Sequence, residues 1–224
     1  MAIKKLLVAA ATGIAAASTT IVIAGGAEYV PMPTYAGVYI EANAGYTTRD
    51  WEQDVSTVYG ASSNISNNLT SPSNINGGFT GGGDIGYQFN EYWSIEGGWF
   101  YLPTVQGTVG NTPSTVNTGL AYGAIKGNIP VYENTYIYGK LGGGYTYNRT
   151  RNTTFPSTDQ ATGVSVSKYW NPVFAVGIQY YFTPNWSANF QYFYDPGYHN
   201  SSSTNYFAPL ANMFTAGVGY KFLV

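Results

Sequence analysis

The 224-residue chain has no cysteine and only one histidine, and Asp, Glu, Lys and Arg together make up 9% of it. The lack of cysteine excludes a disulfide framework and thiolate metal sites, and one histidine among scattered acids has no metal-ligand spacing. The charged share is far below the usual quarter, which is not typical of a water-soluble protein. The net charge of −2 also leaves no basic surface for nucleic acid. We therefore expect no metal, no cofactor and no nucleic-acid partner.

Long apolar runs are missing except near the start of the chain. Lys4 and Lys5 precede an apolar segment that ends near Ala24, and Gly25-Gly26-Ala27 supplies small residues for cleavage. This order is typical of a secretory signal peptide, so we expect residues 1–27 to be removed on export and residues 28–224 to form one domain. A retained membrane anchor is the alternative. No later segment reaches the roughly 18 consecutive apolar residues of a membrane helix.

The rest of the chain alternates with a period of two. Around Glu96, for example, Trp93, Ile95 and Trp99 share one parity, and Ser94 and Glu96 share the other. Successive side chains of a strand point to opposite faces, so the pattern predicts strands with one apolar, aromatic face and one small, polar face. We expect these strands at residues 38–47, 79–89, 93–102, 118–129, 135–147, 173–182, 186–194 and 213–222.

The expected strands are about ten residues long, which suits a tilted crossing of a bilayer. Their connections alternate between tight turns and long polar loops. The long loops are residues 49–78, 103–117, 148–171 and 195–212. This pattern predicts an all-β fold, an eight-stranded antiparallel up-and-down transmembrane β-barrel, with the long loops at one end. A lipocalin-like soluble barrel is the alternative, but its outer wall would need more charge than the polar face carries.

Aromatic residues concentrate near the ends of the expected strands. Such rings form belts at the headgroup levels of a membrane. The belt candidates are Trp51, Tyr92, Trp93, Trp99, Tyr101, Tyr147, Trp170 and Trp186. The alternative is that these rings pack a soluble core.

The polar parity carries three acids and three bases, which would face the lumen of the barrel. The expected lumen charges are Glu41, Asp84, Glu96, Lys126, Lys140 and Lys221, with Gln179, Asn189 and Gln191 among the neutral polar residues. An eight-stranded barrel is just wide enough for side chains to fill it, and an unpaired buried charge is costly. We therefore expect ion pairs, first of all Glu96 with Lys126 or Lys140.

Three stretches resemble the N-terminal transmembrane domain of the outer membrane protein A family. They are Gly86-Tyr87-Gln88-Phe89-Asn90-Glu91-Tyr92, Lys126-Gly127-Asn128-Ile129-Pro130 with Tyr136 to Gly143, and Pro172-Val173-Phe174-Ala175 through Pro184. The resemblance implies a location in the bacterial outer membrane, insertion by the barrel-assembly machinery, and lumen pairs that block or gate a pore. Gln179 and Asn189 replace an acid and an arginine of the family, which removes one switching pair. The family's peptidoglycan-binding domain is expected to be absent.

The function expected from these features is that of a membrane-anchored scaffold whose partners are outer-membrane lipid and a surface ligand bound by the long loops. A small gated pore through the polar lumen is the main alternative, and a route for an apolar ligand through the wall is a third. We expect no enzyme: Asp195 and His199 lie near Ser201 to Ser203 in one loop, but no oxyanion-stabilising group accompanies them.

Overall fold

The computed structural model describes residues 36–49, 69–74, 76–109, 112–151, 164–197 and 210–222. Among these residues there are nine strands and no helix. The strands are β1 (Gly37–Arg49), β2 (Leu69–Ser73), β3 (Gly77–Gln88), β4 (Trp93–Val109), β5 (Thr112–Tyr132), β6 (Thr135–Arg151), β7 (Val164–Tyr181), β8 (Trp186–Asp195) and β9 (Ala211–Lys221). The signal-peptide prediction, Trp51 and His199 lie outside the described residues.

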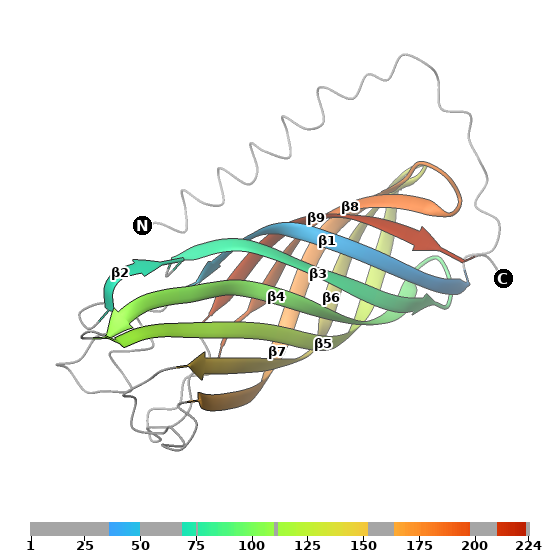
Figure 1. The fold of residues 1–224 in the computed structure, drawn as a ribbon. Helices are drawn as coiled ribbons and strands as arrows, with labels where there is room; N and C mark the ends of the chain where they lie inside the picture. Colours follow the sequence, from blue (N-terminus) through green and yellow to red (C-terminus); the bar gives the residue numbers. More distant parts are fainter. Residues whose placement is uncertain are drawn as a thin grey trace, which may run out of the picture. The chain divides into compact units, whose positions relative to one another are not determined.

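Eight of the strands close into an antiparallel barrel (Figure 1). Each pairs with the next strand of the barrel along the chain, and β1 pairs with β9 to complete the circle. Closure gives backbone N–H and C=O groups a partner on both sides of each strand, which is required in hydrocarbon. The predicted fold class is therefore confirmed.

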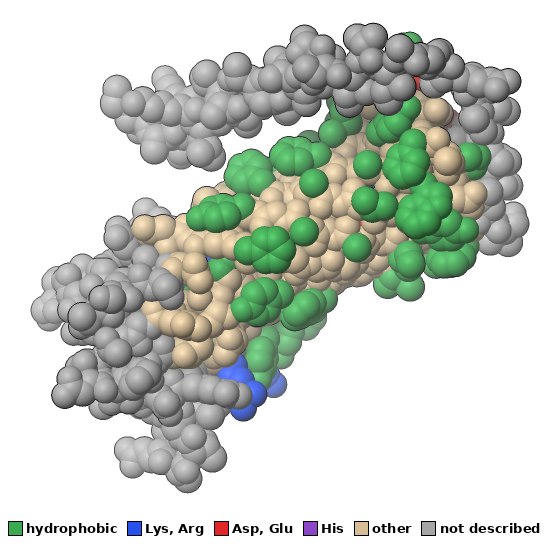
Figure 2. Space-filling view, turned by 45° about the horizontal axis from the view of Figure 1, so that its top comes forward, with side chains coloured by type: hydrophobic (Ala, Val, Ile, Leu, Met, Phe, Trp, Pro, Cys, Tyr) green, Lys and Arg blue, Asp and Glu red, His purple; other side chains and the backbone are tan. Residues whose placement is uncertain are grey.

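The burial of side chains follows the alternation along each strand. In β1 the pattern changes at every residue over most of its length, with Glu41 and Asn43 buried and Ile40 exposed. Most of the coloured side chains on the visible wall are hydrophobic, many of them aromatic (Figure 2). An apolar outside and a polar inside are the reverse of a soluble barrel.

The loop end differs from the sequence-based prediction, because several strands continue where loops were expected. Residues 103–117 belong largely to β4 and β5, and β7 begins at Val164 rather than near Val173. The predicted loop 49–78 contains β2, which pairs with the outer part of β4. The predicted loops 49–78, 103–117 and 148–171 were therefore too long, because Ser, Thr and Asn interrupt the apolar alternation there. Strands that have left the bilayer no longer need an apolar face.

β4 to β7 therefore extend further toward the loops than β1, β8 and β9 do. The β7–β8 pairing begins at Phe174, so β7 from Val164 to Val173 lies beyond its last pair with β8. We call this extension, formed by β2 and the outer parts of β4 to β7, the raised wall. It is visible at the end of the barrel where the grey segments emerge (Figure 1). The β4–β5 register shifts between Leu102 and Val105, next to Pro103, which has no N–H to donate.

Candidate functional site: the barrel lumen

The part of the lumen nearer the short turns contains a group of acidic and basic side chains, which we call the charged tier. It consists of Glu41, Glu96, Lys126 and Lys140, with the rings of Tyr39 and Tyr138. Each of the four charged residues exposes 6% or less of its surface. They come from β1, β4, β5 and β6, and each lies on the inward parity of its strand. Their burial makes mutual pairing an energetic requirement.

Glu96 is the centre of this tier. Its Oε1 lies 2.5 Å from Lys140 Nζ and its Oε2 lies 4.0 Å from Lys126 Nζ. The hydroxyl of Tyr39 donates to Oε2 at 2.9 Å, and that of Tyr122 donates to Oε1 at 2.7 Å. One carboxylate thus joins side chains from β1, β5 and β6 across the lumen. Charge-assisted bonds of this kind are stronger than neutral ones.

Lys126 extends the network to the other side of the barrel. Its Nζ lies 3.5 Å from Glu41 Oε1 and donates to Gln179 Oε1 at 3.0 Å. The amide of Gln179 in turn donates to Glu41 and to Ser187. The ammonium also lies 4.3 Å from the centre of the Tyr138 ring, within cation–π range. The neutral Gln179 therefore links a lysine and an acid in the charged tier.

The other two expected lumen charges have amide partners rather than ion pairs. Asp84 Oδ2 accepts a bond from the Asn43 amide at 2.7 Å, and Lys221 Nζ donates to Gln88 Oε1 at 2.7 Å. Both side chains are buried, but the ion pairs of the described residues involve neither of them. The three acids and three bases of the lumen therefore do not combine into three ion pairs.

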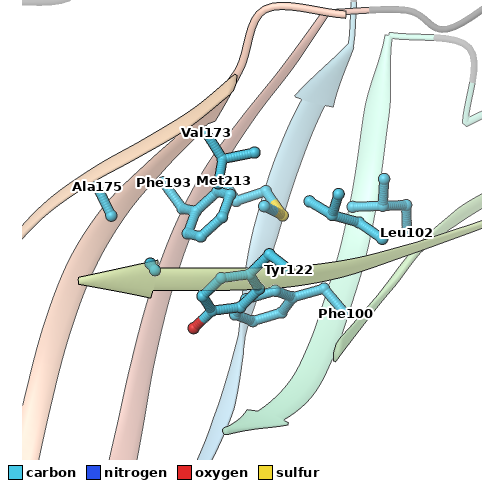
Figure 3. Packing of buried hydrophobic residues seen from close by; sticks show 9 residues of the cluster. Phe100, Leu102, Tyr122, Val173, Ala175, Phe193 and Met213 are labelled. Atoms are coloured by element: carbon cyan, nitrogen blue, oxygen red, sulfur yellow. The ribbon is translucent and has the colours of Figure 1, made fainter. Parts of the chain in front are cut away.

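The upper part of the lumen is apolar. We call this cluster the apolar tier; Figure 3 shows it from close by. It consists of Phe100, Leu102, Leu120, Tyr122, Ala124, Val173, Ala175, Phe193 and Met213. Going from the turns to the loops, Phe100 follows Glu96 on β4 and Tyr122 follows Lys126 on β5. The apolar tier therefore lies on the loop side of the charged tier.

Three aromatic rings form the centre of the apolar tier. The Phe193 ring lies 5.6 Å from Phe100 and 5.0 Å from Tyr122, measured between ring centres, and the Phe100 and Tyr122 rings are stacked. Phe100, Phe193 and Met213 expose none of their surface. The hydroxyl of Tyr122 points away from Val173 (Figure 3) and bonds to Glu96. Tyr122 thus belongs to one tier and contacts the other.

A third, polar layer lies at the loop end of the lumen, and we call it the rim tier. Asp195 accepts bonds from Thr146 and Asn171, both at 3.1 Å. Arg49 Nη1 donates to the carbonyl of Pro103 at 3.3 Å, which links β1 to β4 at the position of the register shift. The Thr146–Asp195 and Arg49–Pro103 bonds of the rim tier connect strands that are not neighbours in the wall.

Two glycines illustrate how a narrow lumen accommodates large rings. A Cβ on Gly86 would lie 2.3 Å from Tyr39 Cζ, and a Cβ on Gly177 would lie 2.5 Å from Tyr138 Cζ. Both distances are shorter than any ordinary contact between carbon atoms. Glycine at these positions therefore leaves the space that the tyrosine rings of the charged tier occupy.

The remaining predicted site residues are placed as follows. Gln179, Asn189 and Gln191 are buried in the lumen. Of the belt candidates, Tyr92, Trp93, Trp99, Tyr101, Tyr147, Trp170 and Trp186 are exposed on the outer wall. Trp93 and Trp186 begin β4 and β8 at the turn end, while Tyr147 and Trp170 lie toward the loop end of β6 and β7.

The structure adds residues to the lumen that the sequence analysis did not single out. Tyr39 and Tyr138 contact the charged tier, and Phe100, Phe193 and Met213 form much of the apolar tier. Each lies on the same parity as a charged or polar residue of its own strand. Parity alone places them inside, but it does not show which of them meet.

The described residues contain no group of three or more possible metal ligands. Nor do they include a helix long and apolar enough to cross a membrane.

The comparison with known families is decisive. A model of the outer membrane protein β-barrel domain matches residues 6–222. The chain belongs to the outer-membrane β-barrel protein family. It is therefore a protein of the bacterial outer membrane, and its apolar outer wall faces lipid. No curated protein sequence matches it significantly.

Several solved outer-membrane barrels have a similar fold. Ail, the attachment invasion locus protein of Yersinia pestis, is 13% identical with a TM-score of 0.53, covering 84% of this chain and all of Ail; that structure is a complex with the heparin analogue sucrose octasulfate. OprG of Pseudomonas aeruginosa is 14% identical with a TM-score of 0.53, covering 86% of this chain and 99% of OprG. AlkL is 18% identical with a TM-score of 0.52, covering 88% and 97%. At these identities the likeness shows the fold of this outer-membrane barrel alone.

Proposed function

We propose that this outer-membrane barrel is a membrane-anchored scaffold that presents its loops for contact with a host, a phage or a neighbouring cell. The observation that carries the proposal is the filled lumen. A solute on its way through would have to separate buried ion pairs around Glu96 and then pass the packed rings of Phe100, Tyr122 and Phe193. With the interior closed by two different tiers, the loop end is the part of the molecule left to act.

The raised wall supports this proposal. β4 and β5 continue past the register shift at Pro103 to Val109 and Thr112, and β6 and β7 reach Arg151 and Val164. Extending strands beyond the bilayer contributes nothing to crossing it. It does hold the segments that follow these strands at a distance from the lipid surface, where a large partner can reach them.

The composition of the loop segments indicates the chemistry of the partner. Residues 50–68, 152–163 and 198–209 contain no lysine or arginine, and they are rich in Ser, Thr and Asn. Asp50, Glu52 and Asp54 make the first segment acidic. These loops therefore differ from what a polyanion such as the Ail ligand requires. We propose a neutral or basic surface ligand, recognised by amides, hydroxyls and aromatic rings.

Replacement of loops tests the scaffold. Residues 50–68 are replaced by a short Gly-Ser linker, and attachment of cells that display the variant to epithelial cells and to phage is measured. We expect attachment to fall while the barrel still shows a heat-modifiable shift on gels. A second variant replaces residues 198–209 in the same way. If neither replacement changes attachment, the scaffold proposal is wrong.

A small pore is the second candidate, and one observation favours it. Both polar atoms of the Asn189 amide are buried without a hydrogen-bond partner among the described residues. Buried polar groups of this kind are commonly satisfied by water, so the lumen beside Asn189 is the place where a water-filled path could begin. Planar-bilayer recording separates the two candidates. The scaffold predicts no discrete conductance, whereas the pore predicts steps that change in Glu96→Ala.

A further inference from the structure

Basic residues are distributed unevenly between the inside and the outside of the barrel. After residue 27 the sequence contains seven, which are Arg49, Lys126, Lys140, Arg149, Arg151, Lys168 and Lys221. Four of these, including Arg49 and Lys221, are buried in the lumen. The other three all belong to β6 and β7. Among the residues whose side chains are described, the exposed basic ones are therefore Arg149 and Lys168, on one pair of neighbouring strands.

Arg149 and Lys168 lie side by side on the outer surface of this pair. Lys168 is opposite Tyr147 in the β6–β7 register, and Arg149 is opposite Val166, one diagonal step away. Diagonal neighbours of this kind are about 7–8 Å apart between Cα atoms. Both side chains are exposed. In Figure 2 blue side chains gather at one place, at the edge of the apolar wall next to the grey segments.

No acid among the described residues neutralises this pair. The ion pairs of the structure lie in the lumen and include neither residue. Across from Arg149, the neighbouring strands contribute Asn117 and Val166, both uncharged. Like charges this close on one face of a sheet repel each other, so an anion shared between them would be stabilising.

The position of the pair along the strands indicates which anion is available. Trp170 is 75% exposed and its ring contacts that of Tyr145 at 5.0 Å. Exposed rings such as these mark the headgroup level of a membrane. Lys168 and Arg149 each lie two residues beyond an exposed ring toward the loops, which is about 7 Å along a strand. In an outer-membrane barrel the long loops face outward, so the pair lies among the headgroups of the outer leaflet.

We propose that Arg149 and Lys168 form a binding site for the phosphate groups of an outer-leaflet glycolipid. The guanidinium of Arg149 can bind a phosphate through two parallel bonds, and the ammonium of Lys168 adds a point charge on the same group or its neighbour. Trp170 and Tyr147 lie beside the site to contact the sugar and acyl portions of the lipid. Arg151 follows Arg149 by one strand repeat and adds positive charge to the same hairpin.

The purified, folded barrel in detergent tests this site, with diphosphorylated lipid A as the probe. We expect the Arg149→Gln/Lys168→Gln double variant to bind lipid A at least about tenfold more weakly, because each basic residue near an anionic surface contributes a factor of about five. The charge-keeping exchange Arg149→Lys/Lys168→Arg should retain most of the affinity. Glu91→Gln, a charge change of one unit at the turn end, should leave it unaltered. A heat-modifiable gel shift shows that each variant is folded.

Two further binding measurements distinguish the phosphate of a lipid from free phosphate. Lipid A without its phosphates should bind to the wild type as weakly as lipid A does to the double variant. Millimolar inorganic phosphate should not compete, because it lacks the acyl chains that place the headgroup beside Trp170. Equal binding of the double variant and the wild type would overturn the proposal. So would equal binding of the two lipids, or competition by free phosphate.

Discussion

The charged tier and the apolar tier lie on the same strands, a few residues apart, and they fill the same lumen by different means. The charged tier relies on a few strong, directional contacts centred on Glu96, whereas the apolar tier relies on close packing of rings around Phe193. The lipid-facing side of those strands is not divided into a charged and an apolar part. Its exposed side chains, such as Leu141 and Ile125, are apolar at the level of the charged tier too. Because the two tiers rely on different contacts, we expect that loss of one tier leaves the other in place.

The largest effect is expected from Glu96→Ala, which removes the carboxylate shared by Lys140, Lys126 and two tyrosines. Two lysines would then be buried near each other without that acid. We expect the free energy of unfolding in phospholipid vesicles, measured by urea titration and gel shift, to fall by about 3–5 kcal/mol. Glu91→Ala in the β3–β4 turn is the control and should change it by less than about 0.5 kcal/mol. A small effect of Glu96→Ala would mean that water solvates the charged tier.

A somewhat smaller loss is expected in the apolar tier from Met213→Ala. The side chain is fully buried, so truncation leaves a cavity and should cost about 2–5 kcal/mol in the same titration. Met213→Leu preserves volume and should cost less than about 1.5 kcal/mol. Because the charged tier is intact, neither variant should conduct ions in a planar bilayer. Discrete conductance in Met213→Ala would contradict the double closure.

Substitutions on the lipid side test the contrast between the divided interior and the uniform exterior. Leu141 is 61% exposed and lies next to Lys140 of the charged tier, on the opposite face. Leu141→Arg should lower the free energy of unfolding by about 2–4 kcal/mol, as for a charge at the bilayer midplane, and Tyr147→Arg near the interface by about 0–1 kcal/mol. Equal effects at the two depths would show that Leu141 does not lie deep in the bilayer.

The smallest effect compares two adjacent glycines of β6. A Cβ on Gly142 would lie 2.0 Å from the carbonyl oxygen of Gly123, while a Cβ on Gly143 would meet nothing within 4 Å. Gly142→Ala should therefore destabilise by about 1–3 kcal/mol. Gly143→Ala should be neutral or should stabilise by up to about 1 kcal/mol, because it restricts the unfolded chain. The reverse order would mean that the two faces of β6 are misassigned.

Much of the wall could be predicted from the sequence, because each strand carries its own alternation. The alternation of Trp93, Ile95 and Trp99 with Ser94 and Glu96 is sufficient to predict a strand and its two faces. The tiers could not be predicted in this way. The position of Phe193 along the barrel axis relative to Glu96 depends on the stagger between strands. The sequence of a single strand does not determine this stagger. Parity places Phe100 and Met213 inside, but it does not bring them together.

The ends of the strands were predicted less well for a related reason. Inside the bilayer every outward residue must be apolar, so the alternation is strict. Beyond it, water satisfies polar side chains on both faces, and stretches such as residues 103–117 and 164–172 resemble loops. Their pairing depends on neighbouring strands that are already aligned lower in the barrel, which is tertiary information.

The order of the strands also has a consequence for how the barrel is made. Apart from β1 with β9, the barrel strands pair with their neighbours along the chain, so most of the sheet can grow hairpin by hairpin. The β1–β9 pairing joins opposite ends of the domain and requires the closure of a very long loop. Contacts so distant in sequence form slowly. The β1–β9 pair is thus the seam of the cylinder, the line along which an unfinished barrel stays open until its final strand arrives.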